Sequence, residues 1–372
     1  MDTYDLCIVG AGLTGATIAR LAAEDSKKVL VIDQREHLGG NVYDSIDPIS
    51  GIRVNKYGAH IFHTNDEGVW EFVNRFSLWK RWEHHVLANI SNTFIPLPIT
   101  IPTINGLYNL HLQTKEDMEK WLSKERIPCE SPTNSEEMAL SKVGSGIYEH
   151  IFKDYTKKQW DKYPNELDPS VLERIPIRTD YDTRYFTDKY QAMPENGYTS
   201  LVESMLLHPN ITIKLNTPWT PDLLKTWKLL VFTGPIDSYF NDIGLPKLEY
   251  RSIKFEWERF YHPGYYQPAP VINYPTLSSP YTRIVEYKHF LHQKSPWTIL
   301  AKETTCADGE PYYPVPTQKN RDLYEKYKKQ VETVRNVHFV GRLASYKYFN
   351  MDQAIRNAMD YYNTILRQNQ DM

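Results

Sequence analysis

Three glycines and one acid near the start of the chain are spaced to hold a dinucleotide. The segment GAGLTG at 10–15 follows an apolar run, and a second apolar run ends at Asp33. The first glycine permits a strand-to-helix turn, the second lets the backbone approach a pyrophosphate, and the third lets helix and strand pack closely. The acid is at the right distance to accept a hydrogen bond from a ribose hydroxyl. A strand, a helix and an acid accompany the glycines, so we favour a dinucleotide site over an ordinary turn.

Two arginines could bind a diphosphate further along the chain. The fork of a guanidinium group holds phosphate oxygens bidentately and neutralises charge that develops on a leaving group. Arg174 and Arg283 are the two candidates. Each could instead be a surface ion-pair partner, because Arg174 follows Glu173 and Arg283 precedes Glu286.

His60 and His63 are three residues apart, a spacing that invites a metal-site interpretation. The sequence around them has no further cluster of His, Cys or carboxylate residues. Zinc sites in proteins use three or four such ligands. We therefore expect no metal.

The composition excludes several classes of protein. A chain of 372 residues should form two or three domains, and no apolar run approaches the roughly 20 residues of a membrane helix. The acidic N-terminus does not resemble a signal peptide, and three scattered cysteines indicate neither disulfides nor zinc, so we expect a cytoplasmic protein. A net charge of −3 without a basic stripe argues against nucleic-acid binding.

Periodicity and turn residues predict an α/β protein with a discontinuous nucleotide-binding domain, a helical insertion and an antiparallel sheet. After a β-α-β unit at 4–35 and a hairpin at 47–54, we expect helices at 65–76, 115–124, 135–143, 146–159, 199–207, 318–331 and from 351 onward. Strands are expected at 85–89, 93–97, 177–193, 211–215, 229–232 and 337–340, with further strands between 248 and 302. The predicted domains are 1–83, 196–245 and 317–372 for the nucleotide, 100–175 for the helices, and 84–99, 176–195 and 246–316 for the antiparallel sheet.

Four segments together resemble the UDP-galactopyranose mutases of the short, bacterial-like type. They are GAGLTG with Gly39-Gly40-Asn41, YGAHIFHT at 57–64, YTKKQW at 155–160 followed by RIPIR at 174–178, and GRLASYKYFNMD at 341–352. The resemblance runs nearly end to end, and the middle two segments are the most specific.

The resemblance implies a Rossmann-like FAD-binding domain and an isomerase that interconverts UDP-galactopyranose and UDP-galactofuranose without net redox change. In this family N5 of reduced FAD attacks the anomeric carbon as UDP leaves, and the sugar opens as a flavin iminium and recloses. NAD(P)H is a candidate external reductant, and short members commonly form homodimers. The implied catalytic residues are Arg174, Arg283 and His63, with His63 near N5.

The resemblance also assigns two sets of binding residues. The FAD set is Gly10, Gly12, Thr14, Gly15, Asp33, Gln34, Gly40, Asn41, His60, Ile61, Arg342, Met351, Asp352, Gln353, Ala354 and Ile355. The substrate set is Phe152, Tyr155, Trp160, Arg174, Tyr185, Asn273, Arg283, Tyr313 and Tyr348, with Tyr155 stacked on uracil and Trp160 in a segment that closes over the substrate.

The chain departs from the family pattern at two positions. Asn350 stands where the family usually has Asp, which keeps the shape and removes the charge. His84 stands where many short members carry Asn near the uridine site.

Two other kinds of protein share the glycine fingerprint. A flavin-dependent amine or sugar oxidase would need neither the paired arginines nor the 155–178 element. A non-enzymatic Rab-escort-like protein would bind no flavin, so it would be colourless, and Arg342 would have no role in it.

Overall fold

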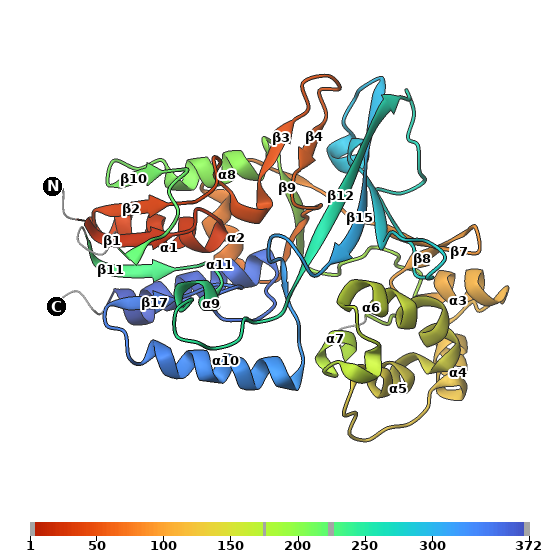
Figure 1. Cartoon of the computed structure of the whole chain (residues 1–372). Coiled ribbons are helices and arrows are strands. Elements are labelled where there is room, and N and C mark those ends of the chain that lie inside the picture. Colours follow the sequence, from red (N-terminus) through yellow and green to blue (C-terminus); the bar gives the residue numbers. More distant parts are fainter. Residues whose placement is uncertain (1–3, 174–175, 222–226, 368–372) are drawn as a thin grey trace.

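A five-stranded parallel sheet forms one side of the molecule (Figure 1). The computed structural model describes residues 4–173, 176–221 and 227–367. The strand order is β10-β2-β1-β11-β17, with β1 (Tyr4–Val9), β2 (Val29–Ile32), β10 (Ile211–Lys214), β11 (Trp227–Phe232) and β17 (Val337–Phe339). The central strands are continuous apolar runs because helices cover both faces of a parallel sheet. Ile8 and Val31 are accordingly fully buried.

Helices pack on both faces of this sheet. On one face α1 (Leu13–Glu24) packs against α8 (Gly197–Leu206) and α11 (Met351–Tyr361). Elsewhere the short α9 (Ile236–Tyr239) and α10 (Gln318–Val331) share a separate apolar cluster that includes Phe240 and Tyr327. The sheet is therefore the centre of a doubly covered Rossmann-like unit.

A seven-stranded sheet stands beside this unit (Figure 1). Its order is β16-β12-β15-β14-β13-β7-β8, with β7 (Val86–Ile90), β8 (Thr93–Leu97), β12 (Tyr250–Tyr261), β13 (Val271–Asn273), β14 (Arg283–Glu286), β15 (Trp297–Cys306) and β16 (Tyr313–Pro314). All neighbouring pairs are antiparallel except β7 and β13.

A helical unit lies beneath one end of that sheet (Figure 1). It contains α3 (Ile101–Tyr108), α4 (Lys115–Glu125), α5 (Ser135–Ile147), a π-helical turn at Tyr148–Phe152, α6 (Lys153–Trp160) and α7 (Ser170–Glu173). Helix α3 was absent from our prediction, although Thr100 and Thr103 form a capping box and proline occupies its first turn. Between α5 and α6 the chain stays helical through the π turn. Tyr155 and Trp160 on α6 therefore belong to a continuous helical segment.

Smaller elements join the two sheets. The hairpin of β3 (Asp44–Ile46) and β4 (Arg53–Asn55) confirms the predicted turn region. Helix α2 (Glu67–Asn74) is also confirmed, with Phe72 and Val73 buried. A third sheet, β5-β9-β6, contains β5 (Phe62–Thr64), β9 (Tyr190–Pro194) and β6 (Trp79–Arg81).

The prediction of strand throughout 177–193 was wrong. Only β9 is a strand, and it pairs with β5 and β6 rather than with the seven-stranded sheet in which we expected 176–195. The preceding segment turns because Asp180 accepts from the backbone of Asp182, and Asp182 accepts from that of Arg184, at 2.9 and 3.0 Å. Such local side-chain bonds offer the backbone an alternative to a strand ladder.

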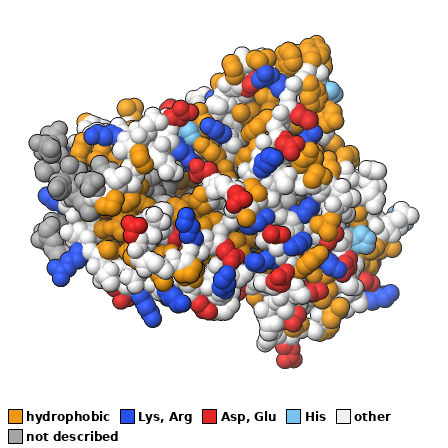
Figure 2. All heavy atoms as spheres, viewed as in Figure 1, with side chains coloured by type: hydrophobic (Ala, Val, Ile, Leu, Met, Phe, Trp, Pro, Cys, Tyr) orange, Lys and Arg blue, Asp and Glu red, His pale blue; other side chains and the backbone are white. Residues whose placement is uncertain are grey.

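On the face of the helical unit seen in Figure 2, Lys and Arg side chains alternate with Asp and Glu. Within the described ranges, no helix has both the length and the apolar composition needed to cross a membrane.

Candidate active site

The first of two cavities lies at the carboxyl ends of β1, β2 and β11, where open α/β sheets bind their ligands. Its volume is about 450 Å³. We call it the dinucleotide cavity. Eleven predicted cofactor residues line it, namely Gly10, Gly12, Thr14, Asp33, Gln34, Gly40, Asn41, His60, Arg342, Met351 and Ala354. Five further predicted residues, all within the described ranges, lie outside its lining: Gly15, Ile61, Asp352, Gln353 and Ile355.

Bare backbone forms the floor of the dinucleotide cavity. Gly10 has a φ of +110°, and a Cβ on Gly15 would lie 1.9 Å from the Gly10 carbonyl oxygen, so strand and helix meet there in close contact. Gly40, from the second glycine segment, has a φ of +56°, and its added Cβ would lie 3.0 Å from the Gly12 Cα. The two glycine segments therefore touch, and side chains at these positions would separate them.

Asp33 stabilises the glycine turn from the end of β2. Its carboxylate accepts from the backbone N–H of Ala11 at 2.8 Å and from that of Arg35 at 2.9 Å. The residue is 8% exposed and borders the cavity. That Asp33 also binds a ribose hydroxyl stays a prediction.

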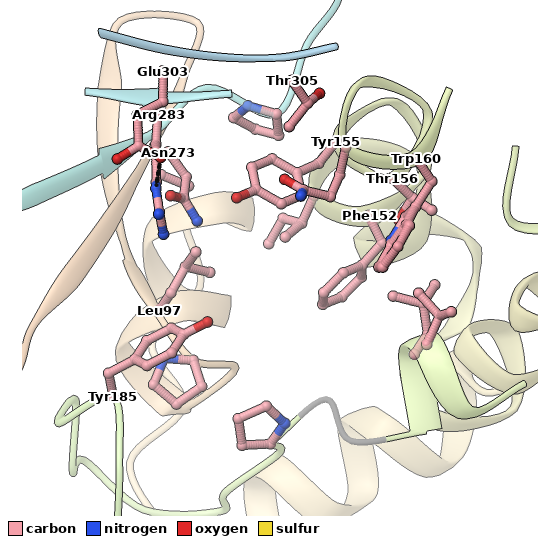
Figure 3. A pocket seen from close by; sticks show the side chains of 18 of the residues that line it. Leu97, Phe152, Tyr155, Thr156, Trp160, Tyr185, Asn273, Arg283, Glu303 and Thr305 are labelled. Carbon is pink, nitrogen blue, oxygen red and sulfur yellow. Dashed lines mark hydrogen bonds and ion pairs between the residues drawn. The ribbon is translucent and has the colours of Figure 1, made fainter. Parts of the chain in front are cut away.

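The second cavity, of about 280 Å³, lies between the helical unit and the seven-stranded sheet (Figure 3). We call it the substrate cavity. All eight described residues of the predicted substrate set line it: Phe152, Tyr155, Trp160, Tyr185, Asn273, Arg283, Tyr313 and Tyr348. The ninth, Arg174, lies outside the described residues. Residues separated by up to 196 positions in the chain thus converge on one space.

An ion pair orients Arg283 at the wall of the substrate cavity. Its Nε donates to Glu303 Oε2 at 2.6 Å, and the Glu303 side chain is only 2% exposed (Figure 3). Burial alone would lower the pKa of Arg283, but Glu303, together with Tyr313 and Tyr155, raises the pKa above its ordinary value. The guanidinium therefore stays cationic. The partner is Glu303 on β15, not the Glu286 that sequence proximity suggested.

Tyrosines connect the two cavities. Burial raises the pKa of Tyr155 and of Tyr313 above the ordinary value, so both hydroxyls remain neutral hydrogen-bond donors. The rings of Tyr313 and Tyr348 stack with centroids 6.1 Å apart. The Arg342 guanidinium, which lines the dinucleotide cavity, lies 4.7 Å from the Tyr348 ring centroid. Arg342 in the wall of the dinucleotide cavity thus packs on Tyr348 in the wall of the substrate cavity.

The two histidines of the 57–64 segment have different surroundings. His60 borders the dinucleotide cavity, its Nδ1 lies 2.7 Å from the Gly58 carbonyl oxygen, and burial lowers its pKa to about 4. His63 contacts Asp188 Oδ2 through Nδ1 at 2.9 Å and stacks on Phe186. His63, also a described residue, lines neither cavity. Its predicted place near N5 stays a prediction.

The metal expectation can be compared with the described part of the chain. No group of three or more His, Cys, Asp or Glu side chains within those residues could hold a metal ion.

Our sequence reasoning missed several cavity residues. Glu303 is the most important, and no local pattern marked it, because it lies in the polar second half of β15, between Lys302 and Thr304. Thr156 and Gln159 line the substrate cavity from the YTKKQW segment, and Trp219 lines the dinucleotide cavity. Trp219 lies in the loop after β10, where no sequence motif indicates a binding residue.

Comparison with protein families gives two matches. The model described as "GLF: UDP-galactopyranose mutase" matches residues 150–348, and an NAD(P)-binding Rossmann-like domain model matches residues 8–76.

Full-length relatives give the same result. A probable UDP-galactopyranose mutase of Klebsiella pneumoniae is 37% identical over 99% of this chain and 97% of its own length. A dTDP-fucopyranose mutase of Escherichia coli is 38% identical over 98% of this chain and 99% of its own. The UDP-galactopyranose mutase of Mycoplasma genitalium is 33% identical over 95% and 93%.

Solved structures share the fold. A crystal structure of reduced UDP-galactopyranose mutase superposes with a TM-score of 0.78 at 17% identity, covering 99% of this chain and 97% of that one. A putative protoporphyrinogen oxidase from an Exiguobacterium species reaches 0.69 at 15% identity, so the fold alone does not separate a mutase from an oxidase. The family model and the full-length relatives make that distinction: the chain belongs to the UDP-galactopyranose mutase family of isomerases.

Proposed function

We propose that this protein interconverts UDP-galactopyranose and UDP-galactofuranose, with FAD in the dinucleotide cavity and the nucleotide sugar in the substrate cavity. The observation that carries this proposal is the junction of the two cavities at Arg342, Tyr348 and Tyr313. A flavin ring bound at that end of the first cavity would face a sugar bound in the second. Family membership supports the same assignment.

The residues of the dinucleotide cavity fit FAD. Helix α1 begins at Leu13 after the N-cap residue Gly12, which among the described residues provides no side-chain cap for the first amides of the helix. Those amides and the helix dipole suit a pyrophosphate, and the glycine contact lets the phosphates come close. Arg342 adds a cation to the same wall. Reduced FAD would supply a nucleophilic N5 for the anomeric carbon.

The substrate cavity suits a nucleoside diphosphate sugar. Phe152, Tyr155 and Trp160 on one wall offer aromatic surface for the base (Figure 3). On the opposite wall Arg283, held by Glu303, would bind the diphosphate and neutralise the charge that grows as the glycosidic bond breaks. The neutral hydroxyls of Tyr155 and Tyr313 would donate to phosphate or sugar oxygens. Arg174 would be a second cation, as the family resemblance implies.

Three finer assignments belong to this proposal; the first two rest on the family resemblance, and the third on the three scattered cysteines. They are NAD(P)H as the external reductant, a homodimer as the assembly, and the cytoplasm as the location.

The deciding experiment compares oxidised and chemically reduced holoprotein incubated with UDP-galactofuranose. Chromatographic separation should show UDP-galactopyranose only with reduced protein, because N5 is nucleophilic only when the flavin is reduced. Absence of conversion by folded, flavin-loaded, reduced protein would refute the proposal. A yellow protein that consumes oxygen with amine or sugar substrates would favour an oxidase, and a colourless one a Rab-escort-like binder.

A second substrate, dTDP-fucopyranose, is favoured by the 38% identity to the Escherichia coli enzyme of that name. The two substrates differ in a methyl group on the base, in the 2′-hydroxyl of the ribose and in the 6-hydroxyl of the hexose. The same assay with dTDP-fucofuranose distinguishes them through the ratio of kcat/KM values. A ratio that favours the dTDP sugar would replace the galactose assignment and retain the mutase chemistry.

A further inference from the structure

A loop of the seven-stranded sheet joins two residues that face the substrate cavity. Asn273 ends β13, Arg283 begins β14, and the two are paired across the ladder. Residues 274–282 form the connection between them. The shape of this loop therefore affects where the Arg283 guanidinium and the Asn273 amide lie.

One lysine from the helical unit inserts into this loop. Lys158 Nζ donates to the carbonyl oxygens of Thr276, Ser279 and Tyr281 at 2.9, 3.2 and 2.7 Å, and also to that of Tyr274. An ammonium group has three N–H donors and a full charge, so its bonds to carbonyl groups are stronger than neutral ones. Four carbonyl groups of a nine-residue loop thus converge on one cation from another part of the chain.

The same lysine belongs to the helix that forms the opposite wall. It lies on α6, three positions after Tyr155 and two before Trp160. Two further bonds fix this end of α6 to the sheet, because Thr305 Oγ1 donates to the Lys158 carbonyl oxygen and Arg251 Nε donates to that of Gln159 at 3.2 Å. Lys158 itself is half-buried behind the lining of the cavity.

We propose that Lys158 is a positioning residue that sets the separation between the base-binding helix and the diphosphate-binding loop. The inference rests on the proposed function, since it names what the two walls of that cavity bind. It predicts that the affinity for some ligands falls when Lys158 is replaced and that the affinity for others does not. A ligand that must reach both walls at once depends on the separation, whereas a ligand that contacts one wall does not.

The test replaces Lys158 by methionine, which keeps the length of the side chain and removes its charge. UDP contacts both walls, so its Kd, measured by isothermal titration calorimetry on the holoprotein, should rise about tenfold or more. Uridine contacts only the base wall, so its Kd, measured by a saturation-transfer NMR titration, should change less than about twofold. The KM for UDP-galactofuranose should rise more than kcat falls. Equal losses of affinity for UDP and for uridine, or no loss of affinity for either ligand, would overturn the proposal.

Two lysines provide matched controls. Lys288 Nζ binds three carbonyl groups, those of His262, Pro263 and Gly264, at 2.7 to 3.0 Å and lies outside the cavity lining. Lys288→Met therefore measures the cost of removing any carbonyl-bound lysine. Lys157→Met removes the neighbouring lysine of α6, whose side chain is 31% exposed and whose Nζ pairs with Asp161 at 3.1 Å. Both control variants should keep the wild-type UDP affinity. A UDP loss in either that matches the loss in Lys158→Met would overturn the proposal.

A measurement without substrate separates this inference from the proposed function. Amide hydrogen exchange of the 274–282 peptide in the holoprotein should speed up in Lys158→Met and not in the controls. If wild-type protein neither binds UDP nor converts the sugar, the proposed function fails, while the exchange result still reports on the loop. Unchanged exchange in Lys158→Met refutes the positioning role even in an active enzyme.

Discussion

The walls of the two cavities touch where Arg342 of the first packs on Tyr348 of the second, yet the two cavities are built by opposite means. The floor of the dinucleotide cavity is backbone, made where two glycine segments touch and two helices begin. The substrate cavity is mainly side chains, with aromatic rings on one wall and the Arg283–Glu303 pair on the other. The first cavity therefore depends on the space that glycines leave, and the second on the charge and shape that side chains supply.

This difference matches the chemistry expected in each place. A cofactor that stays bound needs close, directional contacts, which backbone amides provide without mobile side chains. A substrate that enters and leaves needs a wall that can neutralise changing charge. Arg283 would do this with a guanidinium whose orientation is fixed by a buried carboxylate. Substitutions that remove charge should thus impair the function of the substrate cavity. Substitutions that fill space should impair binding in the dinucleotide cavity.

The largest effect is expected for Arg283→Ala. Loss of the cation beside the diphosphate should lower kcat/KM on the order of 100- to 1000-fold, as for other groups that stabilise charge in a transition state. Flavin content should not change, because Arg283 lies outside the lining of the dinucleotide cavity. Steady-state kinetics with UDP-galactofuranose and the flavin absorbance check the two halves of this expectation.

A double variant serves as the control for Arg283→Ala. The single change leaves Glu303 as a buried carboxylate without its partner, which itself destabilises the fold. Arg283→Ala combined with Glu303→Gln removes that charge and should recover thermal stability without recovering activity. Recovery of both would show that the arginine acts through stability alone.

The corresponding change in the other cavity is Gly40→Ala. A methyl group there would lie 3.0 Å from the Gly12 Cα and force the two glycine segments apart. The Kd for FAD should rise about tenfold, while UDP binding to the flavin-loaded protein stays near normal. Retained flavin after gel filtration and a fluorescence titration measure the change.

Gly51→Ala is the matched control for this variant. Gly51 also has a positive φ, +71°, but open space surrounds the position of its Cβ. It therefore carries the backbone strain of an alanine in the left-handed region without the collision. Equal losses of FAD affinity in the two variants would mean that strain, not occupied space, determines the result.

The same contrast explains what could be predicted from sequence. The dinucleotide cavity comes from spacing within short segments, so GAGLTG and Asp33 indicated it directly. The substrate cavity brings together residues from Ala88 to Tyr348, and no local pattern links them. Its eight described residues were named through family resemblance. Glu303 was missed because pairing between β14 and β15 brings it beside Arg283, and such pairing is invisible in a local pattern.

Elements with strong periodicity were predicted well, and those governed by side-chain bonds were not. The bounds of α10 and the paired strands β7 and β8 agree closely with expectation because their apolar spacing is regular. Helix α3 was missed because Pro98 just before it and Pro102 in its first turn are residues typical of turns. The segment before β9 turns through aspartate contacts that override its strand-forming residues.

A smaller effect is expected behind the substrate cavity, where His84 is 4% exposed and its carbonyl oxygen accepts from the Tyr185 N–H at 2.6 Å. Burial, reinforced by the Arg283 charge, lowers the pKa of His84 to about 3. The unfolded chain then binds more protons than the folded one between about pH 3 and 6.5, so stability falls as pH decreases through that window. From pH 7 to 5, His84 alone should remove about 2 kcal/mol from the free energy of unfolding.

His84→Asn should therefore reduce the acid sensitivity of the fold. Urea unfolding at pH 7 and pH 5 measures it, and the difference between the two pH values should be smaller in the variant than in wild type. His85→Asn is the control, since that neighbour is exposed. An unchanged pH difference in His84→Asn would show that His84 is not held neutral by the fold.

The smallest effect is expected for Asn350→Asp, at the start of the helix that borders the dinucleotide cavity. Asn350 caps α11, and its N–H donates to Gln353 Oε1 at 3.0 Å. Asn and Asp are similarly good caps, and a negative charge at a helix N-terminus adds a few tenths of a kcal/mol. Because the backbone of this wall is kept, kcat/KM should change by no more than about twofold. Asn350→Ala removes the cap and should cost about 1 kcal/mol of stability. This loss is the reference against which the effect of Asn350→Asp on stability is compared. A kinetic change in Asn350→Asp as large as that in Arg283→Ala would mean that side-chain charge governs the dinucleotide cavity too, and the contrast between the two sites would fail.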